Sequence, residues 1–305
     1  MYPKKIHPEK ITVVRSEQKM GVLYLCSTPL GNMSDITRRA LEVLAEVDLI
    51  AAEDTRHTRK LLSHYGINAK ITSYHEHNER EKAPYLLKEL DLGKEIALVS
   101  DAGTPGISDP GYFLVRQALA AGHQVTVLPG PSAVIAALVV SGFSPHPFYF
   151  YGFLPRKKGE RQDILQELEE NPWTGVFYES PHRLRETIKD FCDLWGAERQ
   201  VAVVRELTKQ FEEVFRGSFA DAFDYFSAAP RGEITLVVEG KGKEEECITE
   251  APEMIRDAVD ALIKAGAELH DACKGVGRAL GLSKSQVYRV YHNRKLISDK
   301  ETPSV

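Results

Sequence analysis

The chain has 305 residues, of which 43% are hydrophobic and 27% charged, and 39 basic against 44 acidic side chains give a net charge of −5. This composition excludes a wholly disordered chain, a collagen-like fibre and a small disulfide-rich protein, and the length indicates about two domains. Because the protein as a whole is acidic, any contact with nucleic acid has to come from local basic patches.

The pattern of cysteine and apolar residues predicts a cytoplasmic protein. No C-x-x-C pair occurs among the widely spaced cysteines, so we expect reduced thiols rather than a zinc ribbon; they are Cys26, Cys192, Cys247 and Cys273. The N-terminus carries no apolar run of the kind found in secretory signals. The most apolar stretch, 133–140, is far shorter than the ~20 residues of a membrane span.

Residues 1–20 are predicted to form a basic N-terminal arm, and an N-terminal α/β domain is expected over 21–143. In that domain, short apolar runs alternate with helical patterns. The expected strands are 22–26, 48–52, 70–73, 95–100 and 124–128, and the expected helices are 35–46, 56–65, 80–90, 112–121 and 132–141. Ser34 or Asp35 is the expected N-cap of the first helix. This alternation favours a mostly parallel sheet with helices on both faces.

The sequence Phe-Ser-Pro-His-Pro at 143–147 breaks the pattern and is the expected domain boundary. A second α/β domain is expected over 147–240, with Ser180 capping a helix and Pro181 in its first turn. The charged run 241–250 is typical of a solvated linker. Residues 251–305 are predicted to form a helical appendix. Its basic side chains, interleaved with Tyr288 and Tyr291, resemble the second half of a helix-turn-helix, or else belong to a small packing pair of helices.

The strongest chemical signal is the loop 100–111, Ser-Asp-Ala-Gly-Thr-Pro-Gly-Ile-Ser-Asp-Pro-Gly, which directly follows an apolar strand. In open α/β sheets, ligands bind at the carboxyl ends of strands, and glycines let a ligand approach the backbone. The loop has two aspartates and no lysine, the opposite of a phosphate cradle. It therefore favours a ribose diol, an amino group or a sulfonium, although a long structural turn is the alternative.

Further polar loops follow other predicted strands, at 28–32, 52–57, 74–79, 129–133 and 178–183. None contains the G-x-G-x-x-G dinucleotide fingerprint. His75 and His77 could in principle ligate a metal, but no H-E-x-x-H pattern accompanies them, so we expect no metal site. Acids and imidazoles at one sheet edge suit proton transfer, and the alternative is that they serve as surface caps and salt bridges. Ser132 either caps a helix or helps present N–H groups to a ligand.

These motifs, taken in order, resemble the bacterial small-subunit rRNA methyltransferase I family of the tetrapyrrole methylase superfamily. The motifs are Thr-Pro-Leu-Gly-Asn, Ala-Glu-Asp-Thr-Arg-His-Thr, Tyr-His-Glu-His-Asn-Glu, the loop 100–111, Pro-Gly-Pro-Ser-Ala, Gly-Phe-Leu-Pro, Tyr-Glu-Ser-Pro-His-Arg and Glu-Leu-Thr-Lys. Each motif alone is weak, but the ordered set is specific. The resemblance covers about residues 21–240 and extends less securely to the tail.

The resemblance implies a homodimer of two-domain α/β subunits with S-adenosylmethionine in the cleft between the domains. It also implies 2′-O-methylation of a cytidine ribose in the decoding region of 16S rRNA. By analogy, the cofactor contacts are Pro29, Leu30, Asp101, Gly106, Ile107, Ser132, Ala133 and Tyr178. The candidates for a general base are Glu53, Asp54, His75 and Glu179. The expected RNA contacts are Arg56 and Arg183, with Lys284 and Arg289 in the tail.

Two other interpretations stay open at this point. Another enzyme of the superfamily would methylate a tetrapyrrole or a protein side chain, without need of a basic tail. A non-catalytic regulator would bind nucleic acid through the tail alone. Removal of residues 251–305 separates the two classes, because an enzyme would keep cofactor binding and a regulator would lose all function.

Overall fold

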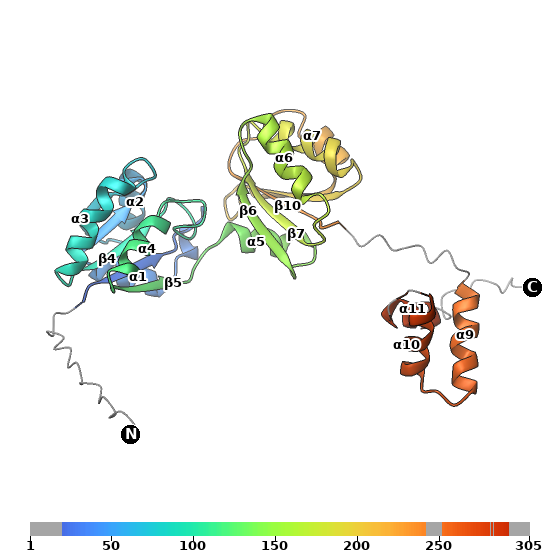
Figure 1. Cartoon of the computed structure of the whole chain (residues 1–305). Coiled ribbons are helices and arrows are strands. Elements are labelled where there is room, and N and C mark those ends of the chain that lie inside the picture. The colour runs from blue at the N-terminus through green and yellow to red at the C-terminus, as the bar shows by residue number, and fades with distance from the viewer. Residues whose placement is uncertain (1–19, 242–251, 281, 283, 293–305) are drawn as a thin grey trace, which may run out of the picture. The chain divides into compact units, whose positions relative to one another are not determined.

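The computed structural model describes residues 20–241, 252–280, 282 and 284–292 (Figure 1). Residues 1–19 of the expected basic arm and Cys247 lie outside the described residues. The chain divides into a larger unit of residues 1–241 and a smaller unit of residues 242–305.

The first sheet of the larger unit is entirely parallel, which confirms the prediction for this region. Its strands lie in the order β3-β2-β4-β1-β5, with every pair parallel. The strands are β1 (Val22–Cys26), β2 (Leu49–Ala52), β3 (Ile71–Ser73), β4 (Glu95–Val99) and β5 (Gln124–Leu128). The helices between them are α1 (Arg38–Glu46), α2 (Thr55–His64), α3 (Glu79–Asp91) and α4 (Tyr112–Ala120).

Both faces of this sheet are covered, as the continuous apolar strands require. Leu44 of α1 and Leu61 of α2 pack in one cluster with Ile50 of β2. Leu86 of α3 and Leu114 of α4 pack in the cluster on the other face. The carboxyl ends of the strands therefore remain available for loops that bind ligands.

The first helix begins later than predicted, so the expected caps Ser34 and Asp35 are wrong. Residues Met33–Asp35 form a separate 3₁₀ turn, η1. The N-cap of α1 is Thr37, whose hydroxyl accepts the N–H of Ala40 at 3.2 Å. Thr37 has an extended backbone and a hydroxyl group, as N-cap residues usually do, and it lies two to three residues after the predicted caps.

The second sheet is mixed and has the order β6-β7-β10-β8-β9. Only β6 and β7 pair in parallel; the other neighbours are antiparallel. Its strands are β6 (Phe148–Phe153), β7 (Thr174–Glu179), β8 (Gln200–Arg205), β9 (Glu213–Ser218) and β10 (Ile234–Val238). Helices α6 (Lys158–Leu168), α7 (Leu184–Trp195) and α8 (Phe219–Tyr225) share one core with one face of this sheet. The antiparallel pair β8–β9 is joined directly by residues 206–212, without a crossover helix.

Helix α5 (Ala133–Ser141) covers the other face of the second sheet. Its Val134 and Leu138 pack with Val176 and Val237 of that sheet. The sequence reading grouped this helix with the first domain because it precedes the break at 143–147. Because α5 is apolar on all sides, its sequence does not indicate which of the two sheets it covers. Its packing in the structure shows that it covers the second sheet.

Helix α7 also begins later than expected. Ser180 was predicted as its N-cap with Pro181 in the first turn, but the N-cap is Arg183. The carbonyl of Ser180 accepts the N–H groups of Arg183 and Leu184, both at 3.1 Å, so residues 181–183 form a turn before the helix. The N–H of Ser180 is held by Glu179, which fixes the chain direction there.

The smaller unit contains α9 (Pro252–Lys264), α10 (Leu269–Leu280) and α11 (Lys284–His292) around a core of its own. Ile255, Val259, Cys273 and Val287 are fully buried in that core. This agrees with the predicted helical appendix. No described helix is both long and apolar enough to cross a membrane.

Candidate functional site

Three loops at the carboxyl edge of the first sheet are joined to one another. Thr28 after β1 and Gly103 after β4 exchange backbone hydrogen bonds of 2.8 and 3.0 Å. The hydroxyl of Thr104 lies 3.1 Å from that of Ser27 and donates to the carbonyl of Pro131 after β5 at 3.3 Å. The loop 100–111 is therefore one wall of a built site rather than an isolated turn.

The shape of this loop depends on glycine at one position in particular. Gly111 has φ +145, and a Cβ there would lie 2.9 Å from Cδ2 of Leu98 and 3.3 Å from the backbone nitrogen of Gly106. The loop therefore folds back closely on itself before α4 begins. This close approach explains why the sequence ends the motif with Pro-Gly.

A reciprocal pair of hydrogen bonds joins the loops after β2 and β4. The backbone N–H of Asp54 donates to Oδ1 of Asp101 at 3.1 Å. The backbone N–H of Asp101 donates to Oε2 of Glu53 at 3.3 Å. Two of the predicted site residues, Glu53 and Asp101, are thus brought together.

A cavity of about 360 Å³ lies between these loops and the second sheet. Most of the predicted cofactor-binding and catalytic residues line it, namely Leu30, Glu53, Asp101, Ile107, Ser132, Ala133, Tyr178 and Glu179. The second sheet adds Phe153, Val204, Leu207 and residues Gly232 to Thr235. A site built from both sheets within one unit is the arrangement expected for a ligand cleft, and its volume is typical of a ligand pocket.

The described lining of this cavity contains no lysine or arginine, but it contains the carboxyl groups of Glu53, Asp101, Asp109, Glu179 and Glu233. Burial, followed by repulsion from Glu53, raises the pKa of Asp109 to about 7. Burial also raises the pKa of Glu53. Such crowding of acids is relieved by a cationic ligand and aggravated by an anionic one.

Sequence reasoning missed several residues of the cavity, among them Asp109, Phe153 and Glu233. Asp109 is the second aspartate of the loop 100–111, Phe153 belongs to Gly-Phe-Leu-Pro, and Glu233 stands in a charged loop before β10. Burial raises the pKa of Tyr178 to about 12, and Asp109 and Glu233 add to the effect. Asp109, Tyr178 and Glu233 all line the same cavity.

Pro29 lines a second cavity of about 360 Å³, which shares Leu30, Asp101 and Glu233 with the first. There the two halves of the unit touch, since the N–H of Asn32 donates to Oγ1 of Thr208 at 3.2 Å. Lys209 lies between Glu206 and Glu233 at 2.8 Å from each. Gly106 lines neither cavity and instead shapes the loop with φ +86.

Asp54 and His75 lie outside the first cavity. Asp54 is the N-cap of α2 and forms a two-point ion pair with exposed Arg56, at 2.8 and 3.2 Å. Hydrogen bonds from Arg56 hold the pKa of Asp54 well below its usual range. The backbone N–H of His75 donates to Oδ1 of Asn78 at 2.8 Å, in the turn before α3.

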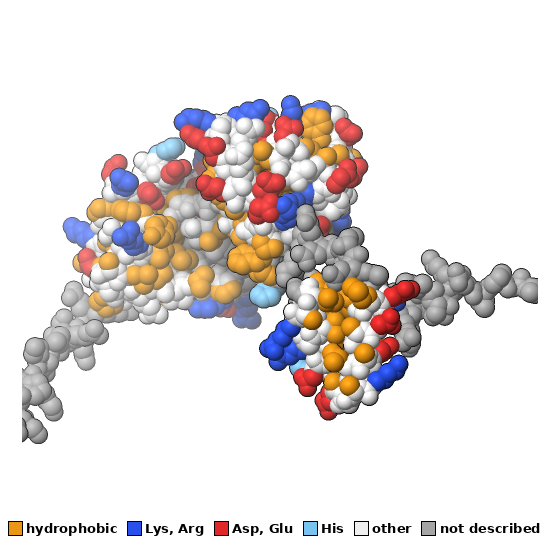
Figure 2. Space-filling model, turned by 45° about the vertical axis from the view of Figure 1, so that its right-hand side comes forward, with side chains coloured by type: hydrophobic (Ala, Val, Ile, Leu, Met, Phe, Trp, Pro, Cys, Tyr) orange, Lys and Arg blue, Asp and Glu red, His pale blue; other side chains and the backbone are white. Residues whose placement is uncertain are grey.

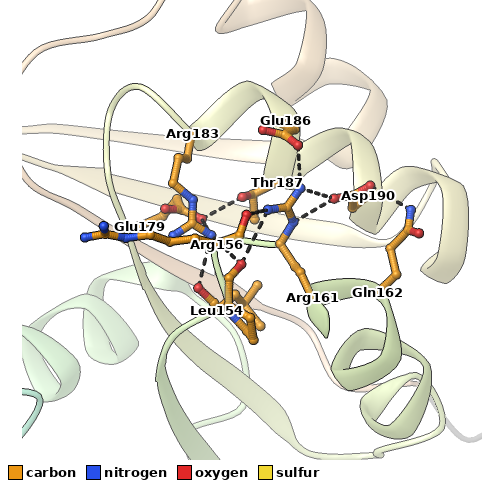
Figure 3. A network of polar contacts seen from close by, with 10 residues as sticks. Leu154, Arg156, Arg161, Gln162, Glu179, Arg183, Glu186, Thr187 and Asp190 are labelled. Atoms are coloured by element: carbon orange, nitrogen blue, oxygen red, sulfur yellow. Dashed lines mark hydrogen bonds and ion pairs between the residues drawn. The ribbon is translucent and has the colours of Figure 1, made fainter. Parts of the chain in front are cut away.

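Glu179 and Arg183 belong to a polar network at the end of β6 (Figure 3). Glu179 accepts the hydroxyl of Thr187 at 2.6 Å, and Nη2 of Arg183 lies 3.5 Å from its Oε2. Nη2 of Arg183 also donates to the carbonyls of Leu154 and Pro155, at 3.0 and 2.9 Å. The guanidinium predicted to bind RNA phosphate is thus engaged within the chain.

Arg161 completes this network from α6. It is fully buried, with Nε donating to Asp190 at 2.7 Å and Nη2 to Glu186 at 2.7 Å. Nη1 donates to the carbonyls of Pro155 and Arg156, at 3.4 and 3.3 Å. Two arginines therefore hold the turn that follows Phe153.

In the smaller unit, Lys284 is exposed at the start of α11, and Arg289 lies in the same helix with its side chain outside the described set. Figure 2 shows hydrophobic side chains gathered on the visible face of this unit, with both basic and acidic side chains around them. Within the described residues, no group of three or more His, Cys, Asp or Glu side chains could hold a metal ion.

The two-sheet fold that builds this cleft at the strand ends is shared with solved methyltransferase structures. The chain matches the family model for Tetrapyrrole (Corrin/Porphyrin) Methylases over residues 22–222. It shares its fold with uroporphyrin-III-C-methyltransferase of Thermus thermophilus, with TM-score 0.52, 19% identity and coverage of 72% of this chain and 94% of that one. Diphthine synthase has TM-score 0.56, 12% identity and coverage of 72% and 90%.

Closer relatives carry the name ribosomal RNA small subunit methyltransferase I. The chain is 43% identical to that of Streptococcus pyogenes serotype M1, over 92% of this chain and 97% of the relative. It is 43% identical to that of Bacillus subtilis, over 90% and 94%. The chain therefore belongs to the tetrapyrrole methylases and, among them, to the ribosomal RNA small subunit methyltransferase I family.

Proposed function

We propose that the protein transfers a methyl group from S-adenosylmethionine to the ribose 2′-oxygen of a cytidine in the decoding region of 16S rRNA. The names of the relatives support the acceptor class, since they describe enzymes of small-subunit rRNA. The observation that carries the proposal is the cavity between the two sheets, which combines acidic groups with apolar walls and has no basic lining residue among those described. We place the reaction in the cytoplasm, where ribosomal subunits are assembled.

The chemistry of the cavity fits S-adenosylmethionine. Carboxylates favour its sulfonium and its amino group, and Leu30, Ile107 and Ala133 offer apolar surface to its adenosine part. Gly103, which lines the cavity, has φ +81, a backbone conformation that favours glycine. A polyphosphate ligand would find no lysine or arginine in the described lining of this cavity.

When bound, S-adenosylmethionine supplies a methyl group on a positively charged sulfur and leaves as a neutral thioether. The new bond joins this methyl group to the ribose 2′-oxygen, and the hydroxyl proton needs an acceptor. We assign that role to Asp109, which lines the cavity with a pKa near neutrality. Glu53 has one carboxylate oxygen engaged by the N–H of Asp101, so it holds the loop in place.

The contacts with RNA are proposed on the exposed cations. Arg56 is exposed at the start of α2, and Lys284 is exposed on the helical unit. Lys284 and Arg289 both belong to helix α11, which we propose as the RNA-binding helix of this unit. Arg183 is left out of this set because its guanidinium holds the turn after β6.

A homodimer is supported by one apolar surface. Helix α5 packs one face on the second sheet, while Ile135 and Val139 are 51% and 70% exposed on the other. Val127 of the edge strand β5 is also exposed. A helix that is apolar all round is normally buried on both sides, so a second copy of the chain would complete this packing.

The decisive experiment supplies tritiated S-adenosylmethionine and small subunits from cells that lack the activity. We expect label in the ribose of a 2′-O-methylated cytidine after nuclease digestion. Cofactor binding without transfer to rRNA would keep the methyltransferase and exclude this acceptor. Absence of cofactor binding would overturn the proposal as a whole.

A further inference from the structure

Phe153, the last residue of β6, presents an exposed aromatic ring to the cavity. Its side chain is 55% exposed and still lines the site. The ring centroid lies 5.4 Å from that of Tyr178, which is backed by Phe150 at 5.0 Å. The Phe153 ring therefore contacts Tyr178 and still leaves more than half of its surface accessible to a ligand.

The backbone around Phe153 is fixed by the strand ladder before it and by hydrogen bonds to the carbonyls after it. The ladder between β6 and β7 shifts register between Phe150 and Gly152, which gives the strand end a local bend. The following carbonyls, from Leu154 to Arg156, accept hydrogen bonds from Arg161 and Arg183 (Figure 3). This clamp positions the ring before any ligand arrives, which lowers the entropic cost of binding.

Phe153 lies where the second sheet approaches the loop 100–111. A Cβ on the neighbouring Gly152 would lie 3.0 Å from Oγ of Ser108. Deeper residues of the cavity are enclosed, as Val204 is 1% exposed. Phe153 therefore belongs to the mouth, which an entering substrate meets, rather than to the enclosed part that suits a resident cofactor.

We propose that Phe153 is the platform on which the base of the acceptor nucleotide stacks. This inference rests on the proposed function, because it assumes an RNA acceptor. Nucleotides presented to an enzyme are extruded from their strand and stacked on aromatic rings. Stacking at the mouth would direct the ribose of the same nucleotide toward Asp109 and the cofactor side of the cavity.

The test compares Phe153→Ala, Phe153→Tyr and the control Phe211→Ala, which removes a ring that is 67% exposed and absent from the described cavity lining. Steady-state transfer to small subunits and calorimetric binding of S-adenosylmethionine are measured for each variant. For Phe153→Ala we expect kcat/KM for the subunit to fall about 5- to 150-fold, the equivalent of ~1–3 kcal/mol of stacking per base. Cofactor affinity should be unchanged. Phe153→Tyr, whose ring can still stack, should recover most of the kcat/KM that Phe153→Ala loses, and Phe211→Ala should stay near wild type.

Three results would overturn the proposal in distinguishable ways. An equal loss of cofactor affinity in Phe153→Ala would assign the ring to the cofactor. Unchanged transfer in Phe153→Ala would remove any role for the ring. A wild-type protein that binds S-adenosylmethionine but does not methylate the subunit would refute the proposed function itself, and this is read without any variant.

Discussion

The backbone N–H of Asp101 donates to Oε2 of Glu53 at 3.3 Å, which ties the loop after β4 to the loop after β2. The side chain of Asp101 returns the contact by accepting the N–H of Asp54 at 3.1 Å. Two adjacent residues of the same loop, Glu53 and Asp54, therefore have different roles. Glu53 lines the cavity and supports Asp101, whereas Asp54 caps α2 and pairs with Arg56.

Exchange of Glu53 and Asp54 for their amides should therefore give different results. Glu53→Gln replaces the carboxylate that accepts the N–H of Asp101 with a weaker, neutral acceptor, and should lower kcat/KM by up to ~10²-fold, because a small misplacement in a site can cost that much. Asp54→Asn keeps a good N-cap and loses only a solvent-exposed pair, so its kcat/KM should remain near the wild-type value. Initial rates of methyl transfer check both, and equal losses would contradict the separation of roles.

The methyl-transfer rate should depend on pH through Asp109. Its pKa is raised to about 7, so the carboxyl is mostly protonated at pH 6 and mostly ionised at pH 8. Because a general base acts in its ionised form, kcat/KM should rise with pH through about 7 and then level off. Asp109→Asn should lose about 10²–10⁴-fold in activity and the rise itself. The exposed Asp224→Asn serves as a control, and a profile that is flat in the wild type would exclude Asp109 as base.

The raised pKa of Asp109 also predicts that the stability of the fold decreases with rising pH, whereas the activity increases. The folded state favours the protonated form of Asp109. The contribution of this group to the free energy of unfolding is therefore fully present below a pH of about 4 and is lost as the pH rises through about 7. Asp109→Asn cannot ionise, so the variant avoids the loss of stability that ionisation of the buried carboxyl causes at high pH. Its Tm relative to wild type should therefore be higher at pH 8 than at pH 5, as thermal melts at both pH values would report. A relative Tm independent of pH would contradict the burial of this carboxyl.

The sequence predicted the first sheet well because its signal is local. Apolar strands such as Val22–Cys26 alternate with helices, and every loop that follows a strand of a parallel sheet meets at one edge. It could not predict that α5 covers the second sheet, because this choice depends on packing between distant segments. Phe153 and Asp109 were missed for the same reason, since their motifs were visible but their common cavity forms only when both sheets are in place.

Arg161 should be the most destabilising of the buried charges to remove. It is fully buried between Asp190 and Glu186, so Arg161→Met leaves the carboxylate of Asp190 buried without its partner. We expect the free energy of unfolding to fall by ~3–5 kcal/mol, and Arg161→Met combined with Asp190→Leu to recover part of it. Lys157→Ala, which removes an exposed ion pair from the same helix region, should stay within ~0.5 kcal/mol. Denaturant unfolding measures all three, and a single variant as stable as wild type would contradict the role of the network.

The helical unit should contribute affinity for RNA but not for the cofactor. It has a core of its own, and the described lining of the first cavity comes from the larger unit. Deletion of residues 251–305 should therefore leave S-adenosylmethionine binding intact and raise the KM for the ribosomal subunit. If Lys284 contacts a phosphate, Lys284→Ala should weaken RNA binding and reduce the slope of log K against log salt by ~1. Met254→Ala, on an exposed apolar position of the same unit, is the matched control. A deletion that abolishes cofactor binding would instead show that the unit supports the cleft, and an unchanged salt slope would remove Lys284 from the interface with RNA.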